Sequence, residues 1–166
     1  MKTLKESILS RSSHGAGGFE AQRRRIIEDW LKEHNINNYT INDDSTIDVS
    51  EDISFEIQIL KEFPEYIQFG VVEGFFNCSN CYLKSLRGVP RIVGGYFDCS
   101  DNELTSLEGA PENVGGSFIC NSNKLTSLEG APKEVNGFYC NENLLTSLKG
   151  APKKVKGKFD CRSNII

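Results

Sequence analysis

The stretch CSDNELTSLEGAPENVGGSFI (residues 99–119) recurs with few changes along the second half of the chain. Residues 120–139 read CNSNKLTSLEGAPKEVNGFY, and residues 140–160 read CNENLLTSLKGAPKKVKGKFD. The unit before them, residues 78–98, reads CSNCYLKSLRGVPRIVGGYFD, and residues 161–166 open one more unit. Self-similarity at a period of 20–50 residues is typical of repeat architectures, so these units predict a solenoid.

The shared pattern, C-x-x-N-x-L-x-S-L-x-G-x-P-x-x-V-x-G-x-F-x, gives each position a physical role. Phe97 and Cys99 lie two residues apart, so in a short strand both point inward. Asn102 follows the strand, where its amide can satisfy backbone groups of a tight turn, and stacked repeats would form a ladder of such amides. Leu104 and Leu107, and their counterparts at 83/86, 125/128 and 145/148, fill the interior behind the strand. The G-x-P segment breaks any helix, so we expect turns or extended chain on the return side.

Six cysteines in a chain of 166 residues suggest a disulfide framework or a zinc site, but their spacing indicates a structural period instead. Five of them are 21, 21, 20 and 21 residues apart: Cys78, Cys99, Cys120, Cys140 and Cys161. Cys81 takes the asparagine position of the first clear unit. A structural zinc needs about four converging ligands, and only Cys78 and Cys81 form a close pair. We therefore expect the thiols to act as small apolar core groups, with no metal and no cofactor.

The unit matches the leucine-rich-repeat pattern L-x-x-L-x-L-x-x-N/C-x-L, with Asn102 at the Asn/Cys position and Leu104 closing it. The first aliphatic position departs from this pattern, since Gly94 stands there and the apolar residue is Val93. The unit closely resembles the LTSLEGAP-type leucine-rich-repeat proteins encoded by tailed bacteriophages, and more distantly the short proline-containing repeats of bacterial effector proteins. The resemblance implies a cytosolic, phage-type, non-enzymatic protein.

A fainter turn is expected before the clear units, because Ile57 lies 21 residues before Cys78 and Phe55 lies two residues before Ile57. By this spacing Ile57 would occupy the cysteine position of that turn and Phe55 the phenylalanine position.

Residues 1–52 do not repeat and are predicted to cap the solenoid, which occupies residues 53–166. Leu4, Ile8 and Leu9 suggest a short helix, and residues 10–18, SRSSHGAGG, read as a flexible linker. A second helix is expected from Phe19 to His34, and residues 39–41 and 47–49 alternate as a hairpin joined by residues 42–46. Its apolar face is Phe19, Ile26, Ile27, Trp30 and Leu31, with Arg23 to Arg25 largely opposite. The expected fold class is α+β: a short leucine-rich-repeat solenoid of parallel strands with a helix-plus-hairpin cap.

Composition argues against several classes of function. The net charge is −4 and the pI is near 5.3, whereas general nucleic-acid or membrane-surface binders are usually basic. No stretch approaches the roughly 18 apolar residues that span a bilayer, and residues 1–13 lack the apolar core of a secretory signal, so a cytoplasmic location is expected. Two basic clusters, Arg23 to Arg25 and Lys149, Lys153, Lys154, Lys156 and Lys158, favour solvated faces; direct nucleic-acid binding is the weaker alternative.

No catalytic motif stands out, so an enzyme is not expected. His14 and His34 are the only histidines, and neither accompanies a nucleophile in a recognisable motif. Residues 15–18, GAGG, follow no expected strand and precede no Gly-Lys-Ser/Thr, unlike a phosphate-binding loop. The acidic run at residues 42–48 lacks the spacing of an EF-hand and suits a turn.

The outward side chains of the predicted strands are the expected binding surface. Tyr96, Ile119 and Tyr139 are apolar or aromatic groups among Asp, Ser and Asn, which suits a protein hot spot with a polar rim. The predicted contact residues on this concave face are Tyr96, Asp98, Ile119, Asn121, Tyr139, Asn141, Asp160 and Arg162, and a possible edge contact comprises Asn164, Ile165 and Ile166. We expect a protein-binding module, plausible as an inhibitor or modulator of a host defence enzyme, nuclease or ATP-dependent protease. The alternative is a virion or assembly component that self-associates through the uncapped edge.

Overall fold

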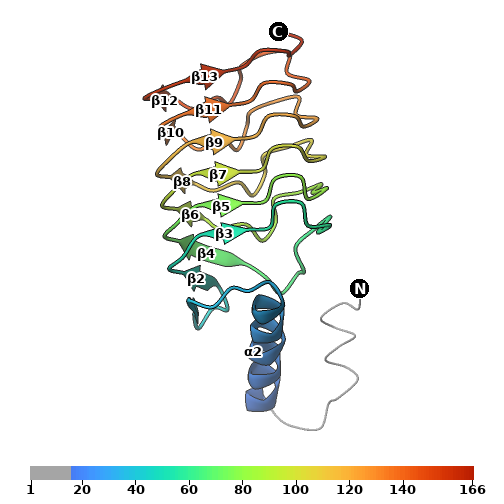
Figure 1. Ribbon diagram of the computed structural model, residues 1–166, viewed down its shortest axis with the longest axis vertical. Coiled ribbons are helices and arrows are strands. Elements are labelled where there is room, and N and C mark those ends of the chain that lie inside the picture. The colour runs from blue at the N-terminus through green and yellow to red at the C-terminus, as the bar shows by residue number, and fades with distance from the viewer. Residues whose placement is uncertain (1–15) are drawn as a thin grey trace.

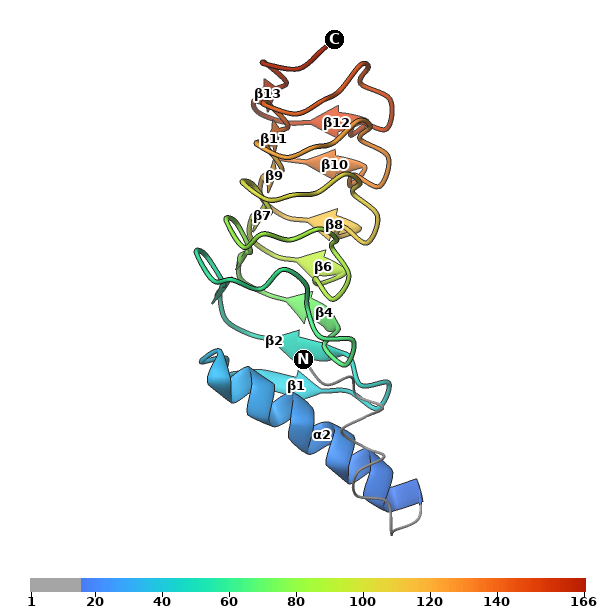
Figure 2. The ribbon, with the colours of Figure 1, turned by 90° about the vertical axis from the view of Figure 1, so that its right-hand side faces the viewer.

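The computed structural model describes residues 16–166, which form a parallel β-solenoid of about five turns with one helix and an antiparallel hairpin at its start (Figure 1). Each turn contributes two very short strands, and the equivalent strands of successive turns stack into two columns. Figure 2 shows the helix lying below the first strands, at the opposite end of the molecule from the C-terminus.

The first column is a six-stranded parallel sheet, here called the front sheet. In chain order its strands are β3 (Ile53–Ser54), β5 (Phe76–Asn77), β7 (Phe97–Asp98), β9 (Phe118–Ile119), β11 (Phe138–Tyr139) and β13 (Phe159–Asp160). The register pairs each phenylalanine with that of the next turn, as in Phe97 with Phe118. The predicted F-x-C strand is therefore confirmed.

The second column, here called the back sheet, lies on the return side of each turn. It comprises β1 (Tyr39–Ile41), β2 (Ile47–Val49), β4 (Phe69–Val72), β6 (Ile92–Val93) and β8 (Asn113–Val114), and β10 (Glu134–Val135) and β12 (Lys154–Val155) form a two-stranded parallel pair in the following turns. The return side is extended, as expected, and the only helix among residues 16–166 precedes the repeats.

Glycine forms the corner between the two columns because neighbouring turns approach closely there. A Cβ added at Gly94 would clash with the carbonyl oxygen of Glu73, and one added at Gly115 would clash with that of Gly94. The G-G pair of the repeat therefore allows the chain to pass from β6 of the back sheet, which ends at Val93, to β7 of the front sheet, which begins at Phe97, within three residues.

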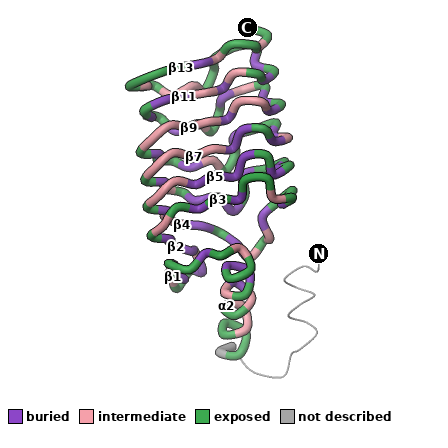
Figure 3. Tube along the Cα trace, in the orientation of Figure 1, coloured by how far each residue is buried: buried purple, intermediate pink, exposed green. Residues whose placement is uncertain are grey.

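The core is a set of columns in which equivalent residues of successive turns touch. The inward phenylalanines form a column: the rings of Phe76 and Phe97 are stacked with centroids 5.9 Å apart, and those of Phe97 and Phe118 are tilted with centroids 5.2 Å apart. Cys99 beside them and Leu104 and Leu107 behind them are fully buried, as are their counterparts in the adjoining turns. Figure 3 shows this burial repeating from turn to turn. Burial of each such side chain favours folding by roughly 1.5–3 kcal/mol.

The last turn described departs from this pattern, because among residues 16–166 only the short segment after Phe159 lies beyond it. Leu148 is 41% exposed and Phe159 is 36% exposed, whereas their counterparts Leu128 and Phe138 are fully buried. The prediction that Leu148 fills the interior is therefore wrong for this turn.

The predicted asparagine ladder is confirmed, and it links successive turns. Asn102 Nδ2 donates to the carbonyl oxygens of Cys99 (3.1 Å), in its own turn, and Cys78 (2.9 Å), in the turn before. Its Oδ1 accepts from the backbone N–H groups of Cys81 (3.0 Å) and Leu83 (2.8 Å). Asn123, Asn143 and Asn164 likewise bond the carbonyl oxygens of their own and the preceding turn. Backbone groups that leave the strand are thus satisfied inside the solenoid.

The residue before each ladder position adopts a left-handed backbone conformation. The φ angles are 53–55° at Asn80, Asp101, Ser122, Glu142 and Ser163. This local reversal turns the following side chain back into the core, and Asn and Asp tolerate it better than most residues.

Cys81 occupies the asparagine position of its turn, as predicted. Its Sγ lies 3.0 Å from the carbonyl oxygen of Phe55 and 3.1 Å from that of Ser79. The Cys81 thiol donates to backbone carbonyl groups as the asparagine amide nitrogen does, but its sulfur is a weak acceptor and cannot replace the amide oxygen.

The expected alignment of the faint first turn is wrong by two residues. Ile53 pairs with Phe76, so Phe55 stands in register with Cys78 and is 1% exposed. Ile57 has a φ of 66° and is 72% exposed. The loop between this turn and the next is two residues longer than in the other repeats, and therefore counting 21 residues back from Cys78 misplaced the strand.

The helix α2 (Ala16–Glu33) begins three residues earlier than predicted. Ala16 to Gly18, assigned to the linker, belong to it. Ile27, Trp30 and Leu31 face the core, but Phe19 is 47% exposed because it lies in the first, projecting turn. The predicted helix near Leu4, Ile8 and Leu9, the rest of the linker, and His14 lie outside the described residues.

The cap joins the solenoid through both packing and backbone. The Trp30 ring lies 5.8 Å from that of Phe55 and 6.3 Å from that of Phe63. The predicted hairpin is confirmed: β1 and β2 pair antiparallel, and β2 then pairs in parallel with β4. The hairpin is therefore the first rung of the back sheet.

We expect Asn123→Ala to destabilise the protein by about 2–4 kcal/mol, because it leaves several buried backbone groups of two turns without partners. Asn121→Ala, two residues away, removes one bond to a neighbouring hydroxyl and should change stability by less than about 0.5 kcal/mol. Urea denaturation followed by circular dichroism measures both values. Equal losses in the two variants would contradict a structural role for the ladder.

Candidate protein-binding face

The outward side chains of the front sheet form a regular array, here called the front face. Because residues alternate along a strand, the positions flanking each inward Phe and Cys point outward. The row before the inward Phe comprises Phe75, Tyr96, Ser117, Gly137 and Lys158; the row after it comprises Ser54, Asn77, Asp98, Ile119, Tyr139 and Asp160. The row after the inward Cys comprises Glu56, Ser79, Ser100, Asn121, Asn141 and Arg162.

Four partly exposed apolar or aromatic side chains run obliquely across four successive turns of the front face. They are Phe75, Tyr96, Ile119 and Tyr139, here called the apolar strip. The rings of Phe75 and Tyr96 stack in parallel, with centroids 4.7 Å apart and an interplanar angle of 8°. At the other end, Lys158 Nζ lies 5.6 Å from the centroid of the Tyr139 ring.

The structure brings the three predicted hot-spot residues onto one face, and it adds Phe75. Sequence reasoning missed Phe75, although it lies 21 residues before Tyr96 and could have been found from that spacing. A Cβ at Gly137 would come 3.0 Å from the Tyr139 ring, so the glycine at this position leaves room for that ring.

Several polar members of the array serve the backbone rather than solvent. Asn77 accepts a hydrogen bond from Ser79 N (2.9 Å), Asp98 from Ser100 N (2.9 Å), and Asp160 from Arg162 N (3.3 Å). The Asp160 side chain lies in the outward row but is only 4% exposed, because Lys158 and Arg162 bind its carboxylate. Asn121 and Asn141 remain partly exposed, and Arg162 is exposed.

Asp98 and Asp160 occupy the same row but opposite electrostatic environments. Arg162 binds the Asp160 carboxylate through two nitrogens (2.9 and 2.7 Å), and Lys158 Nζ lies 3.1 Å away. These cations hold the pKa of Asp160 well below its usual range. Burial raises the pKa of Asp98, the Ser100 hydrogen bonds oppose that shift, and the charges of Asp101 and Glu56 add to it. No salt bridge to Asp98 is found among residues 16–166.

The predicted lysine cluster is partly neutralised by glutamates of the preceding turn. Lys149 lies 2.9 Å from Glu129, and Lys154 and Lys156 lie 3.2 Å and 3.0 Å from Glu134. In the cap, Arg24 pairs with Glu28 at 3.1 Å. These exposed pairs add little stability individually, but they reduce the positive field of both clusters.

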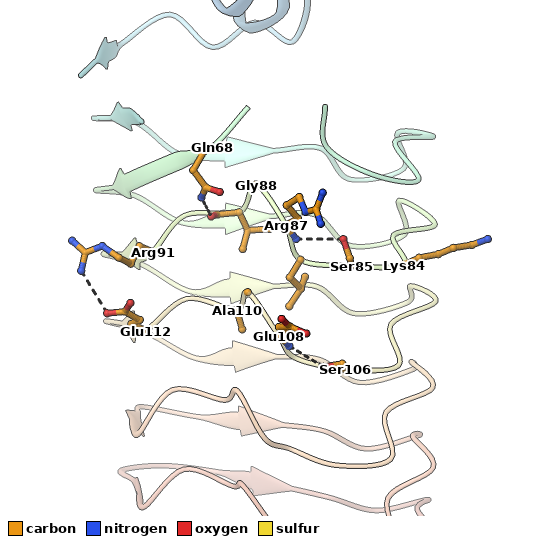
Figure 4. Close-up of a pocket in the computed structure, with 13 residues that line it drawn as sticks. Gln68, Lys84, Ser85, Arg87, Gly88, Arg91, Ser106, Glu108, Ala110 and Glu112 are labelled. Atoms are coloured by element: carbon orange, nitrogen blue, oxygen red, sulfur yellow. Dashed lines mark hydrogen bonds and ion pairs between the residues drawn. The ribbon is translucent and has the colours of Figure 1, made fainter. Parts of the chain in front are cut away.

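A groove of about 580 Å³ lies on another side of the solenoid, between residues 84–91 and 106–112 (Figure 4). At its edge Arg91 and Glu112 face one another at 3.5 Å, and Gln68 Nε2 donates to the carbonyl oxygen of Val89 at 3.0 Å. Lys84 points away from the groove in Figure 4. Arg91, Glu112 and Gln68 are therefore already engaged in interactions within the protein.

The buried thiols are poorly suited to nucleophilic or metal chemistry at neutral pH. Burial raises the pKa of Cys78, Cys99 and Cys120, and it raises that of Cys81 to about 11 and that of Cys140 to about 12. The thiolate, which is the reactive and metal-binding form, is therefore rare. Within residues 16–166 no three or more His, Cys, Asp or Glu side chains converge as metal ligands.

The remaining chemistry-bearing residues have structural contacts. His34 stacks on Trp30 with centroids 4.0 Å apart, and its Nδ1 lies 2.8 Å from the Trp30 carbonyl oxygen. In the hairpin loop, Asp44 accepts hydrogen bonds from Thr46 N (2.9 Å) and Thr46 Oγ1 (2.7 Å), as the turn interpretation predicted.

Comparison of the chain with protein-family models, curated proteins and solved structures gives no match. Within residues 16–166, no helix has the length and apolar character needed to cross a bilayer. The front face therefore has to be interpreted from its own geometry and charge.

We expect Asp98→Asn to raise the melting temperature at pH 7 and Asp160→Asn to lower it. The raised pKa of Asp98 means that its stabilising contribution is present at low pH and lost as pH rises through the folded-state pKa. The lowered pKa of Asp160 means that its contribution is present above the unfolded-state pKa, near 4, and lost as pH falls through the folded-state pKa. A shift of 1 kcal/mol corresponds to about 2–4 °C in a chain of this size.

Differential scanning calorimetry at pH 7 and pH 3 measures both shifts. Both differences from the unsubstituted protein should shrink at pH 3. Asparagine keeps the acceptor that the turn needs, as Asn77 shows in the preceding repeat. Shifts of the same sign at pH 7 would contradict the contrasting environments of the two carboxylates.

Proposed function

We propose that this protein is a non-enzymatic binding module that recognises another protein through the front face. The observation that carries the proposal is the apolar strip, because it places four partly exposed apolar or aromatic groups on a rigid sheet among polar side chains. Interface centres are enriched in aromatic residues, and polar rims surround them.

The rigidity of the strip supports this proposal. The inward neighbours of Tyr96, Ile119 and Tyr139 are Phe97, Phe118 and Phe138, which are fully buried and whose rings adjoin one another. The outward side chains are thus presented on a backbone fixed by core packing, and binding need not order a loop first. Preorganisation of this kind lowers the entropic cost of association.

The target proposed on the sequence resemblance is a bacterial host protein, such as a defence enzyme, a nuclease or an ATP-dependent protease. In that setting the chain is a phage-type leucine-rich-repeat protein that acts in the host cytoplasm as an inhibitor or modulator. The Asn/Cys ladder position and the inward Leu pair support the leucine-rich-repeat assignment.

Replacing Tyr96, Ile119 and Tyr139 together with serine should reduce partner capture at least about tenfold, because truncation of a hot-spot residue commonly costs 1–2 kcal/mol or more. Quantitative pull-down from bacterial lysate, followed by calorimetry with the purified partner, measures the loss. A matched triple variant on the groove side, Ser85→Ala, Ser106→Ala and Ser127→Ala, should retain capture. Undiminished capture by the serine variant, with its melting temperature unchanged, would overturn the proposal.

A second candidate function is self-assembly through the edge of β13, and a specific observation favours it. Among residues 16–166, β13 is the last strand of the front sheet; its Phe159 is exposed, as are Leu148 of the same turn and the edge residues Ile165 (64%) and Ile166 (61%). A free edge with apolar flanks can pair with another strand. A concentration-dependent oligomer that dissociates on Ile165→Asp and Ile166→Asp would favour this candidate over the first.

A further inference from the structure

The charges of the front face are segregated along the solenoid axis. The end nearer the helix is acidic. The charges of Asp101 and Glu56 raise the pKa of Asp98. The charges of Asp98, Asp52 and Glu56 raise the pKa of Tyr96. At the other end, Lys158 and Arg162 flank Asp160. A partner that covers this face must therefore place positive charge over the first end.

The acidic end combines an aromatic surface with an uncompensated carboxylate. Tyr96 stacks on Phe75, and Asp98 follows two residues after Tyr96 on the same outward side. In the same row, Asp160 holds two cations within 3.1 Å, whereas the pKa of Asp98 rises through burial and like-charge neighbours. Asp98 could therefore pair with a cationic side chain of a partner, as Asp160 already pairs with Lys158 and Arg162 of its own chain.

We propose that the acidic end of the front face binds an arginine or lysine side chain from a basic segment of the partner protein, set against the Tyr96 ring and paired with Asp98. Guanidinium groups stack on aromatic faces and pair with carboxylates, and this end presents both groups together. Ile119 and Tyr139 then receive the apolar residues of the same segment. This inference rests on the proposed function and specifies the chemistry of its partner.

The size of the face favours an extended segment over a second copy of the chain. Six strands spaced about 4.8 Å apart give a length of roughly 24 Å, and about five residues at 3.3 Å each give a width of roughly 16 Å. The resulting area, about 400 Å², is roughly half of what each partner buries in a standard protein interface. A segment of five or so extended residues spans the apolar strip, which crosses four turns or about 14 Å.

The test uses the peptide acetyl-RLRLR-amide as the probe and acetyl-ELELE-amide as its charge-reversed control. Titration of the isotope-labelled full chain, followed by NMR, should show saturable shifts at Tyr96, Asp98 and Ile119 with the basic peptide alone. Asp98→Asn should weaken binding about tenfold, since it removes the charge of the acceptor in a hydrogen bond between charged groups. Tyr96→Ala should weaken it about two- to fivefold, and Tyr96→Phe, which keeps the ring, should bind normally.

Glu112→Gln is the matched control for net charge, because Glu112 lies on the groove side and its removal changes the total charge as Asp98→Asn does. Equal weakening by Glu112→Gln and Asp98→Asn, or equal binding of the two peptides, would overturn the inference. A dimer of the unsubstituted chain that Asp98→Asn dissociates, seen by sedimentation, would assign the face to a second copy and also overturn it.

Binding of the captured partner by two variants distinguishes failure of this inference from failure of the proposed function. If the triple serine variant of Tyr96, Ile119 and Tyr139 loses the partner while Asp98→Asn retains full affinity, the binding face stands and the basic-segment inference fails. If both variants retain the partner, the proposed function fails as well. Loss in both variants, with unchanged melting temperature in the triple variant, supports both.

Discussion

The buried asparagine ladder is the interaction on which the rest of this structure depends. The strands of the solenoid are mostly two residues long, so each pair of neighbouring strands supplies few backbone hydrogen bonds. Each asparagine bonds carbonyl groups of its own and the preceding turn, and Asn102 also accepts from two backbone N–H groups. A slip of one residue would leave these buried groups unpaired, and each unpaired group costs about 1–3 kcal/mol. The ladder, together with the phenylalanine stack, therefore sets the register.

A fixed register has a consequence for the surface. Inward positions vary little from turn to turn because their side chains touch their own equivalents. Outward positions are not constrained in this way, and the row that follows the inward Phe holds asparagine, aspartate, isoleucine, tyrosine and aspartate in successive turns. The inward positions of the solenoid thus hold similar residues in every turn, whereas the outward positions differ from turn to turn. These differences give the front face its apolar strip and the segregation of its charges.

The two aspartates of that row show why residue identity does not define a site. Asp98 and Asp160 have the same place in the repeat and the same backbone hydrogen bond. Asp160 is held ionised by Arg162 and Lys158, whereas Asp98 has acidic neighbours and partial burial. The difference arises from side chains in other turns and other rows, which only the folded chain brings together.

The repeat by itself determined the period, the inward columns, the asparagine ladder with Cys81 in it and the extended return side, and the alternating residues before the repeat determined the hairpin. These features could be predicted because each follows from local spacing and from contacts between equivalent positions. The structure alone decided the alignment of the first turn, where a longer loop moved Phe55 rather than Ile57 into the core. It alone also decided the start of the helix, the stacking of Phe75 on Tyr96 and the burial of Asp160. Those outcomes depend on loop length and on neighbours in adjacent turns, and a repeat pattern carries information about neither.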